Sequence, residues 1–239
     1  MDLRSVKEVV KRLRIKNSLI NSMIPLIPLG LGANLDFKYT AFIVQVFLLN
    51  CYVFWINDYY DAPFDKEDIG KRERNIFCDK ESIEAELGTV LVVTSAIIPI
   101  LIGLLIDPIQ NTENTTFILT VIALNYYVFW INDYNTPLDA KNKIFLAGAL
   151  ISVLFGLFFG PKFIFFSFGF LLVATLYVHP IFRGKQRKFW DILFHIAWPV
   201  ITFYYSYTYF FMIDEMFWIF SLFFSCSAIY SQMGQQLRD

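Results

Sequence analysis

The densest group of chemically useful side chains lies where an apolar segment ends in the sequence NDYYDAPFD. Its members are Asn57, Asp58, Asp61 and Asp65. Spacings of three and four residues place the three aspartates on one face if the chain stays helical. Carboxylates held this close repel one another, so the pattern favours a bound cation such as Mg²⁺, which prefers oxygen ligands. Pro63 should kink or end the helix near Asp61, because its ring opposes the carbonyl of Tyr59.

Basic side chains follow this acidic stretch in the sequence KRERN. Lys71, Arg72 and Arg74 could neutralise a phosphate group at the same surface, because they donate charged hydrogen bonds to phosphate oxygens. The combination predicts a site for magnesium together with a diphosphate. A solvated acidic loop at a membrane edge is the simpler alternative, since charge clusters in loops commonly serve solubility.

A second group of polar residues lies in the sequence LYVHPIFRGKQRKFWDILFHIAWP. Its members are Tyr177, Arg183, Lys185, Asp191 and His195. Ionisable groups within membrane spans are candidates for function, because they are costly to bury there. Two simpler interpretations stay open: the basic residues could serve only to orient a loop, and His195 could be a hydrogen-bonded interior histidine.

Helices that cross a membrane must position these residues. Of the 239 residues, 56% are hydrophobic and only 17% are charged, which excludes an ordinary water-soluble globule. The sequence shows no basic patch typical of nucleic-acid binding, and its three cysteines lack the spacing of a zinc site. We therefore expect an all-α fold, a polytopic transmembrane bundle of about eight spans, near residues 18–34, 39–56, 87–106, 115–131, 144–160, 163–178, 192–211 and 216–230.

Lysine and arginine divide the predicted loops into two sets. Of the 20 basic residues, 18 lie at the two ends and in one set of alternating loops, while only Lys38 and Lys162 lie in the other. Positive charge accumulates in cytoplasmic loops. The pattern predicts a multi-pass integral membrane protein with both termini and the motif-bearing loops on the cytoplasmic side.

The first 17 residues combine apolar positions at helical spacing with six basic side chains. Such a helix lies in the membrane interface, where anionic headgroups attract its positive charge. We therefore expect two parts: an interfacial amphipathic helix at 1–17 and a transmembrane helical bundle at 18–239.

An internal repeat lies within the predicted bundle. Residues 40–59 and 115–134 share 14 of 20 positions, including the identical sequence YVFWINDY. Both copies end on the same predicted side, which indicates a duplicated helical hairpin and not an inverted repeat. The second copy keeps Asp133 and Asp139 but lacks the middle aspartate. One open hypothesis is that these two carboxylates hold a second metal ion.

Together these features resemble the UbiA-type intramembrane prenyltransferases. NDYYDAPFD fits that family's first aspartate-rich pattern, NDxxDxxxD; KRERN follows it, and YVHPIFRGK is similar to the family's tyrosine-to-lysine loop. The resemblance implies a UbiA-like helical bundle with a lipid-accessible cavity and Mg²⁺ as cofactor. It also implies a prenyl diphosphate donor and a lipophilic or aromatic acceptor, whose identity stays open.

The resemblance also implies roles for individual residues. Metal binding would involve Asp58, Asp61, Asp65 and Asp239. Substrate binding would involve Asn57, Arg72, Arg74, Asn75 and Arg183. Catalysis would depend on Asp58, Asp61, Tyr177 and Lys185. Asp239 would begin the family's second aspartate motif, and the sequence stops there, so we expect an N-terminal portion of a longer protein.

Three classes of function are compatible with these patterns. The favoured one is an enzyme, a magnesium-dependent prenyltransferase that transfers an isoprenyl group from a prenyl diphosphate to an apolar acceptor in the membrane. The second is an inactive or truncated prenyltransferase-like scaffold that binds a polyphosphate lipid. A transporter is less favoured, because the predicted spans carry almost no ionisable residue besides His195.

Overall fold

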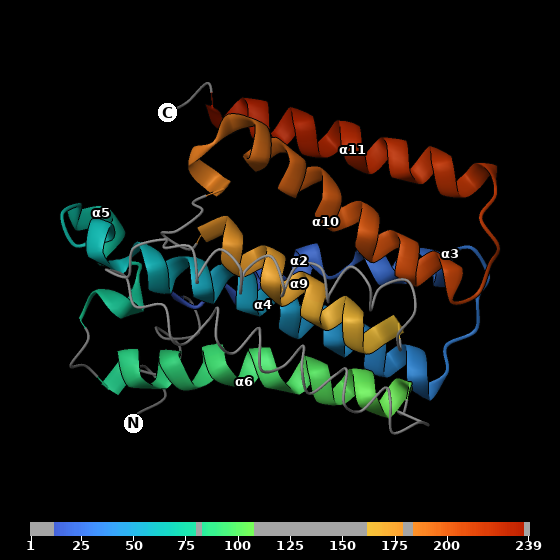
Figure 1. The fold of residues 1–239 in the computed structure, drawn as a ribbon, viewed down its shortest axis with the longest axis horizontal. Coiled ribbons are helices and arrows are strands. Elements are labelled where there is room, and N and C mark those ends of the chain that lie inside the picture. Colours follow the sequence, from blue (N-terminus) through green and yellow to red (C-terminus); the bar gives the residue numbers. More distant parts are fainter. Residues whose placement is uncertain (1–11, 80–82, 108–161, 179–183, 237–239) are drawn as a thin grey trace, which may run out of the picture.

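The structure is a computed structural model that describes residues 12–79, 83–107, 162–178 and 184–236 (Figure 1). Every regular element in these ranges is a helix, as the sequence predicts. Several predictions fall outside the described residues, namely those on Arg183, Asp239, residues 1–11, the spans at 115–131 and 144–160, and the second repeat with Asp133 and Asp139.

Three described helices contain stretches long and apolar enough to cross a membrane. They are α4 (Phe37–Asp65), α6 (Ile83–Ile106) and α11 (Glu215–Gln236). Helix α9 (Lys162–Val178) is apolar but has only 17 residues, and α10 (Lys188–Thr208) carries a larger share of polar side chains. The helices are consistent with a membrane protein, and the arrangement of eight spans stays a prediction.

Helix α4 is the central helix of the described bundle, and it packs against α2 (Ile15–Asn21), α6 and α9 (Figure 1). Its apolar stretch is 56% buried, compared with 28% for α6 and 17% for α11. Tyr39, Phe42, Val46 and Leu49 are fully buried, and their spacing of three and four residues defines one helical face. The acidic residues therefore lie at the end of the most buried of these three long apolar helices.

A buried glutamine connects three helices within the bundle. Gln45 Nε2 donates to the carbonyl oxygens of Pro99 (2.8 Å) and Phe163 (2.9 Å) and lies 2.8 Å from Ser167 Oγ. Pro99 belongs to α6, and Phe163 belongs to α9. Because a buried amide is destabilising unless it is hydrogen-bonded, these contacts fix how α4, α6 and α9 align along one another.

The expected span at 18–34 is not one continuous helix. The chain there forms α2, the 3-10 helix η1 (Ile24–Leu26) and the one-turn helix α3 (Ile27–Gly30). Pro25 and Pro28 each lie in the first turn of a new helix, because proline fits that position but cannot continue a preceding helix. The Tyr39 hydroxyl donates to the carbonyl of Pro25 at 2.6 Å and holds this interrupted segment against α4.

Pro63 does not end the helix near Asp61, which is one of the two outcomes predicted for it. Helix α4 continues to Asp65 with Pro63 inside its last turn. The proline removes one backbone hydrogen bond, to the carbonyl of Tyr59, and the helix ends two residues later, so little regular structure is lost. Asp58, Asp61 and Asp65 therefore share one helical face.

Two carboxylates stabilise the opposite end of the bundle, where α10 and α11 join as a hairpin (Figure 1). Asp36 caps α4 by accepting a backbone N–H three residues later (2.6 Å), and it also accepts from the Tyr209 hydroxyl (2.9 Å). Asp214 directly precedes α11 and accepts a backbone N–H three residues later (3.1 Å) and the Tyr207 hydroxyl (2.7 Å). Neutral donors satisfy both carboxylates at helix N-termini, where the helix dipole favours negative charge.

Candidate functional site

The last turns of α4 carry Asp58, Asp61 and Asp65, which we call the acidic cluster, to one end of the bundle. Asp58 is 5% exposed, and the other two are half-buried. A carboxylate as deeply buried as Asp58 needs a cation or hydrogen-bond donors to stay charged. Each member of the cluster has such a partner, from a different segment of the chain.

Two cations that are far apart in the sequence pair with Asp58 and Asp61. Arg14 Nη1 lies 3.4 Å from Asp58 Oδ1. Lys185 Nζ forms an ion pair with Asp61 and donates to Asn57 Oδ1 at 3.4 Å. Because Lys185 follows Asp61 by 124 residues, only the fold brings these groups together.

Arg14 has a strained backbone conformation, and contacts with α4 hold it in this position. Its φ angle is 54°, in the left-handed region, which costs a residue with a side chain roughly 1–2 kcal/mol. The preceding residue, Leu13, is buried, and its carbonyl accepts the indole N–H of Trp55 at 2.7 Å. Thus Trp55 and Asp58, both on α4, fix this part of the N-terminal segment, which the sequence predicted to lie in the membrane interface.

Asn75 connects the loop after α4 to the acidic cluster. Its Nδ2 donates to the carbonyl oxygen of Asp58 (2.7 Å) and to Asp65 Oδ2 (2.9 Å). Its own carbonyl accepts from Arg12 Nη2 at 3.3 Å. A single buried residue therefore joins the N-terminal segment, the loop and the last turns of α4.

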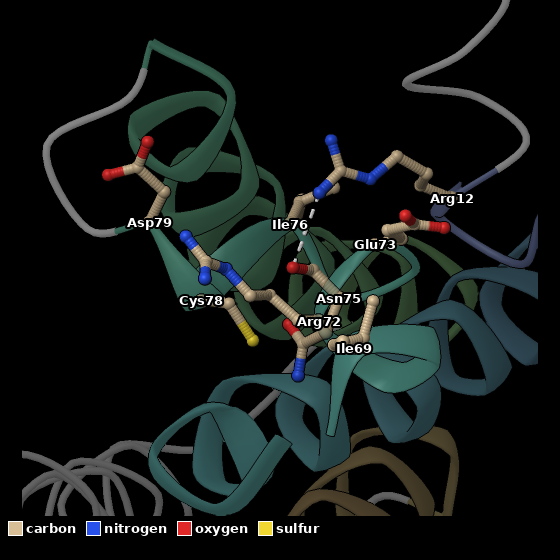
Figure 2. A pocket seen from close by; sticks show the side chains of 8 residues that line it. All are labelled: Arg12, Ile69, Arg72, Glu73, Asn75, Ile76, Cys78 and Asp79. Carbon is tan, nitrogen blue, oxygen red and sulfur yellow. Dashed lines mark hydrogen bonds between the residues drawn. The ribbon is translucent and has the colours of Figure 1, made fainter. Parts of the chain in front are cut away.

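A pocket of about 420 Å³ lies beside the cluster, with Asn75 in its wall (Figure 2). Arg12 reaches it from the N-terminal segment, and Arg72 reaches it from α5 (Ile69–Arg72). Burial raises the pKa of the Cys78 thiol, which argues against a nucleophilic role for that residue. The remaining lining residues are Ile69, Glu73, Ile76 and Asp79.

The acidic cluster offers oxygen donors of the kind that Mg²⁺ prefers. Mg²⁺ takes oxygen ligands and commonly uses only one or two carboxylates, while water and substrate phosphates complete its shell. Asp58 and Asp61, about one turn apart on α4, could supply the carboxylates. Within the described ranges, no group of three or more His, Cys, Asp or Glu residues is placed to hold a metal ion. Side-chain cations neutralise Asp58 and Asp61 there.

Tyr177 and His195 lie around Asp191, next to the cluster. The Tyr177 hydroxyl donates to Asp191 Oδ1 at 2.6 Å, and Tyr177 is close enough to Asp61 to interact electrostatically. His195 Nδ1 lies 2.8 Å from the carbonyl oxygen of Asp191, one turn earlier in α10. His195 is therefore hydrogen-bonded within its own helix, but 38% of its side chain is exposed, so it is not a fully interior histidine.

The fold collects some of the predicted site residues and separates others. Hydrogen bonds and ion pairs connect Asn57, Asp58, Asp61, Asp65, Asn75 and Lys185. Tyr177 lies beside this group at Asp191, whereas Arg72 lines the neighbouring pocket. Arg74 Nε donates to the carbonyl of Gly70 at 3.0 Å, within its own loop.

Sequence reasoning missed Arg14 and Gln232 at this end of the bundle, and it gave Asp191 no role. Arg14 is one of six basic residues in the first 17, and its spacing does not distinguish it from the others. Asp191 did carry a signal, because it is an acidic residue at the start of an apolar segment.

A scan against protein-family models gives no match, and searches of curated proteins and of solved structures give none either. The function of the site is therefore inferred from the chemistry of its own residues.

Proposed function

We propose that the protein is a magnesium-dependent prenyltransferase, which moves an isoprenyl group from a prenyl diphosphate to an apolar or aromatic acceptor in the membrane. The observation that carries this proposal is the pairing of Asp58 with Arg14 and of Asp61 with Lys185 at the end of an apolar helix. The carboxylates can bind a metal ion, and the cations can bind phosphate oxygens. A prenyl diphosphate requires both the metal-binding carboxylates and the phosphate-binding cations, and it requires them next to the bilayer that holds its apolar tail.

In this proposal Asp58 and Asp61 would supply carboxylate oxygens to Mg²⁺, and water and diphosphate oxygens would complete its shell. The bound ion supplies positive charge that makes the diphosphate a better leaving group. Arg14 and Lys185 would exchange their carboxylate partners for diphosphate oxygens, so each charged group would keep a partner of opposite sign. The proposal also places both termini and the site on the cytoplasmic face, as the distribution of basic residues favours.

The transfer breaks the bond between the allylic carbon and a diphosphate oxygen, and the electron pair leaves with the diphosphate. Lys185 and Arg14 stabilise the negative charge that develops there. The aromatic rings of Tyr177 and Phe194, whose centroids lie 5.0 Å apart, would shield the positive carbon from water. A carbon or oxygen atom of the acceptor supplies the electron pair of the new bond and loses a proton to water.

The experiment that tests this proposal uses the full chain in lipid nanodiscs with farnesyl diphosphate, Mg²⁺ and a panel of lipophilic and aromatic acceptors. We expect release of inorganic diphosphate together with a prenylated product, and loss of both when EDTA removes the metal. Asp58→Ala and Asp61→Ala should each lower the rate at least about 100-fold. Asp36→Ala, at the opposite end of α4, is the matched control and should stay active. Full activity of either cluster variant would contradict the assignment.

A second candidate is a prenyltransferase-like scaffold that binds a polyphosphate lipid without turnover. The ion pairs favour it, because Arg14 and Lys185 neutralise Asp58 and Asp61 and so stabilise the site without a metal. This candidate predicts that farnesyl diphosphate binds to the nanodiscs in the presence of Mg²⁺ and is recovered intact. Binding and diphosphate release, measured on the same sample, distinguish the two functions.

A further inference from the structure

Asp191 connects three helices next to the acidic cluster. It lies in the first turn of α10 and is 5% exposed. Its Oδ1 accepts from the hydroxyl of Tyr177 on α9 at 2.6 Å, and its Oδ2 accepts from Nε2 of Gln232 on α11. Three helices therefore meet at one buried carboxylate that the transfer reaction, as described above, does not use.

The surroundings of Asp191 link it to Asp61. The 3-10 helix η4 (Gly184–Gln186) lies just before α10 and carries Lys185, the ion-pair partner of Asp61. Tyr177 interacts electrostatically with both Asp61 and Asp191. Of these two carboxylates, Asp191 is the one that accepts the Tyr177 hydroxyl hydrogen.

A phenol that donates to a carboxylate gains electron density on its oxygen and ring, because a charged acceptor polarises the O–H bond more than a neutral one does. An electron-rich ring attracts positive charge more strongly. In the proposed reaction the allylic carbon becomes positive as the diphosphate leaves. The Tyr177 ring is well held for this task, since its centroid lies 5.0 Å from that of Phe194 and 5.8 Å from that of His195.

We infer that Asp191 is a positioning residue of the transfer reaction, which acts through Tyr177 by fixing the phenol and by enriching it in electrons. Gln232 holds Asp191 from the side of α11, so the last turns of that helix belong to the site. This inference rests on the proposed prenyl transfer.

Replacement of Asp191 by asparagine separates this role from simple packing. Asparagine has the same shape and can still accept from the Tyr177 hydroxyl. Gln232 Oε1 is buried and has no hydrogen-bond partner among the described residues. A flipped Gln232 amide could therefore use this oxygen to accept from the side-chain amide of the introduced asparagine. D191N thus keeps the hydrogen bonds to Tyr177 and Gln232 and removes the negative charge, which also lies 3.4 Å from His195 Nδ1.

The experiment measures kcat and KM for diphosphate release from farnesyl diphosphate, with the full chain in nanodiscs and saturating Mg²⁺. Asp191→Asn should lower kcat about 10- to 100-fold and leave KM within about twofold, because the lost charge acts in the transition state. Tyr177→Phe should have a similar effect, and the double variant should be no slower than Tyr177→Phe alone. Asp214→Asn, which alters the same kind of tyrosine–carboxylate hydrogen bond at the opposite end, should change kcat less than about twofold.

Each result of these measurements has a definite meaning. Losses that multiply in the double variant, or an unchanged kcat in Asp191→Asn, would overturn the role of Asp191 while the prenyltransferase proposal stands. A wild-type chain that binds the donor but releases no diphosphate would overturn both. If Asp191→Asn does not fold, Gln232→Met replaces it. This variant keeps the charge of Asp191 but removes the hydrogen bond to its Oδ2, so the carboxylate no longer fixes Tyr177 as firmly. It should lower kcat in the otherwise wild-type chain but not in a chain that also carries Tyr177→Phe.

Discussion

The two ends of the described bundle hold their carboxylates in different ways. At one end, Asp36 and Asp214 accept neutral donors, a nearby backbone N–H and a tyrosine hydroxyl each. At the other end, Asp58 and Asp61 pair with cations from distant segments of the chain. The first arrangement is sufficient for capping a helix. The second brings together charges of both signs that can be exchanged for a metal ion and an anion, and this is why we place the function there.

Removal of a cation from the acidic end should have the largest effect. Lys185→Met takes away the partner of Asp61 and, in the proposed reaction, a group that stabilises the leaving diphosphate. Diphosphate release should fall at least about 100-fold. Tyr207→Phe is the matched control at the opposite end and should keep its rate. Comparable losses in both variants would show that the two ends do not differ in function.

A smaller effect is expected from Arg14→Gln, which leaves the buried Asp58 without its guanidinium. Because the Arg14 side chain is 39% exposed, the free energy of unfolding should fall by about 1–3 kcal/mol, and not by the larger amount typical of a fully buried pair. Mg²⁺ should stabilise this variant more than the wild type, because the ion no longer competes with Arg14 for Asp58 and because ligand binding to the folded state raises stability. Thermal unfolding with and without Mg²⁺ measures the difference. An equal Mg²⁺ response in both proteins would argue against a metal at Asp58.

Asp36→Ala removes the cap of α4 and the acceptor of the Tyr209 hydroxyl. Loss of a helix cap costs about 1 kcal/mol, so thermal unfolding should shift modestly. The shift should be the same with and without Mg²⁺, because no cation is exchanged at that end. A Mg²⁺-dependent shift would mean that the two ends are coupled.

The smallest effect concerns Asp214, whose pKa lies below its ordinary value of 3.8, chiefly because the Tyr207 hydroxyl donates to it. A lowered pKa in the folded state contributes stability above pH 3.8 that is lost as the pH falls through the folded value. NMR titration of ¹³C-labelled aspartate should give a pKa for Asp214 that rises toward 3.8 in Tyr207→Phe. An unchanged pKa would mean that the phenol does not contribute.

The sequence predicts the long apolar helices well. Runs of about 20 apolar residues are a strong signal, and the predicted ranges 87–106, 163–178 and 216–230 lie within or along α6, α9 and α11. The segment at 18–34 has the right composition, but Pro25 and Pro28 divide it into short helices. Hydropathy alone does not register this, because it averages over the positions where the backbone must break.

The sequence predicts the acidic residues of the candidate site but not the basic residues that pair with them. Spacing on a single helix is a local property, so the sequence places Asp58, Asp61 and Asp65 on one face correctly. Arg14 and Lys185 reach these carboxylates through the packing of α2 and η4 against the bundle, and no pattern of residues encodes which basic side chain arrives. Gln232 is hidden for the same reason, since its partner Asp191 precedes it by 41 residues.

The Gln45 contacts have a consequence for the order in which the chain is made. On the ribosome, α4 is complete long before its partners exist, because Pro99 and Phe163 follow Gln45 by 54 and 118 residues. Until α9 emerges, the Gln45 side-chain amide lacks its acceptor from that helix. Other polar groups or water must accept its hydrogen bond during this time. Assembly of the bundle is therefore a late event of synthesis, and chains stalled before residue 163 should leave the Gln45 region open to water-soluble labels that the finished protein excludes.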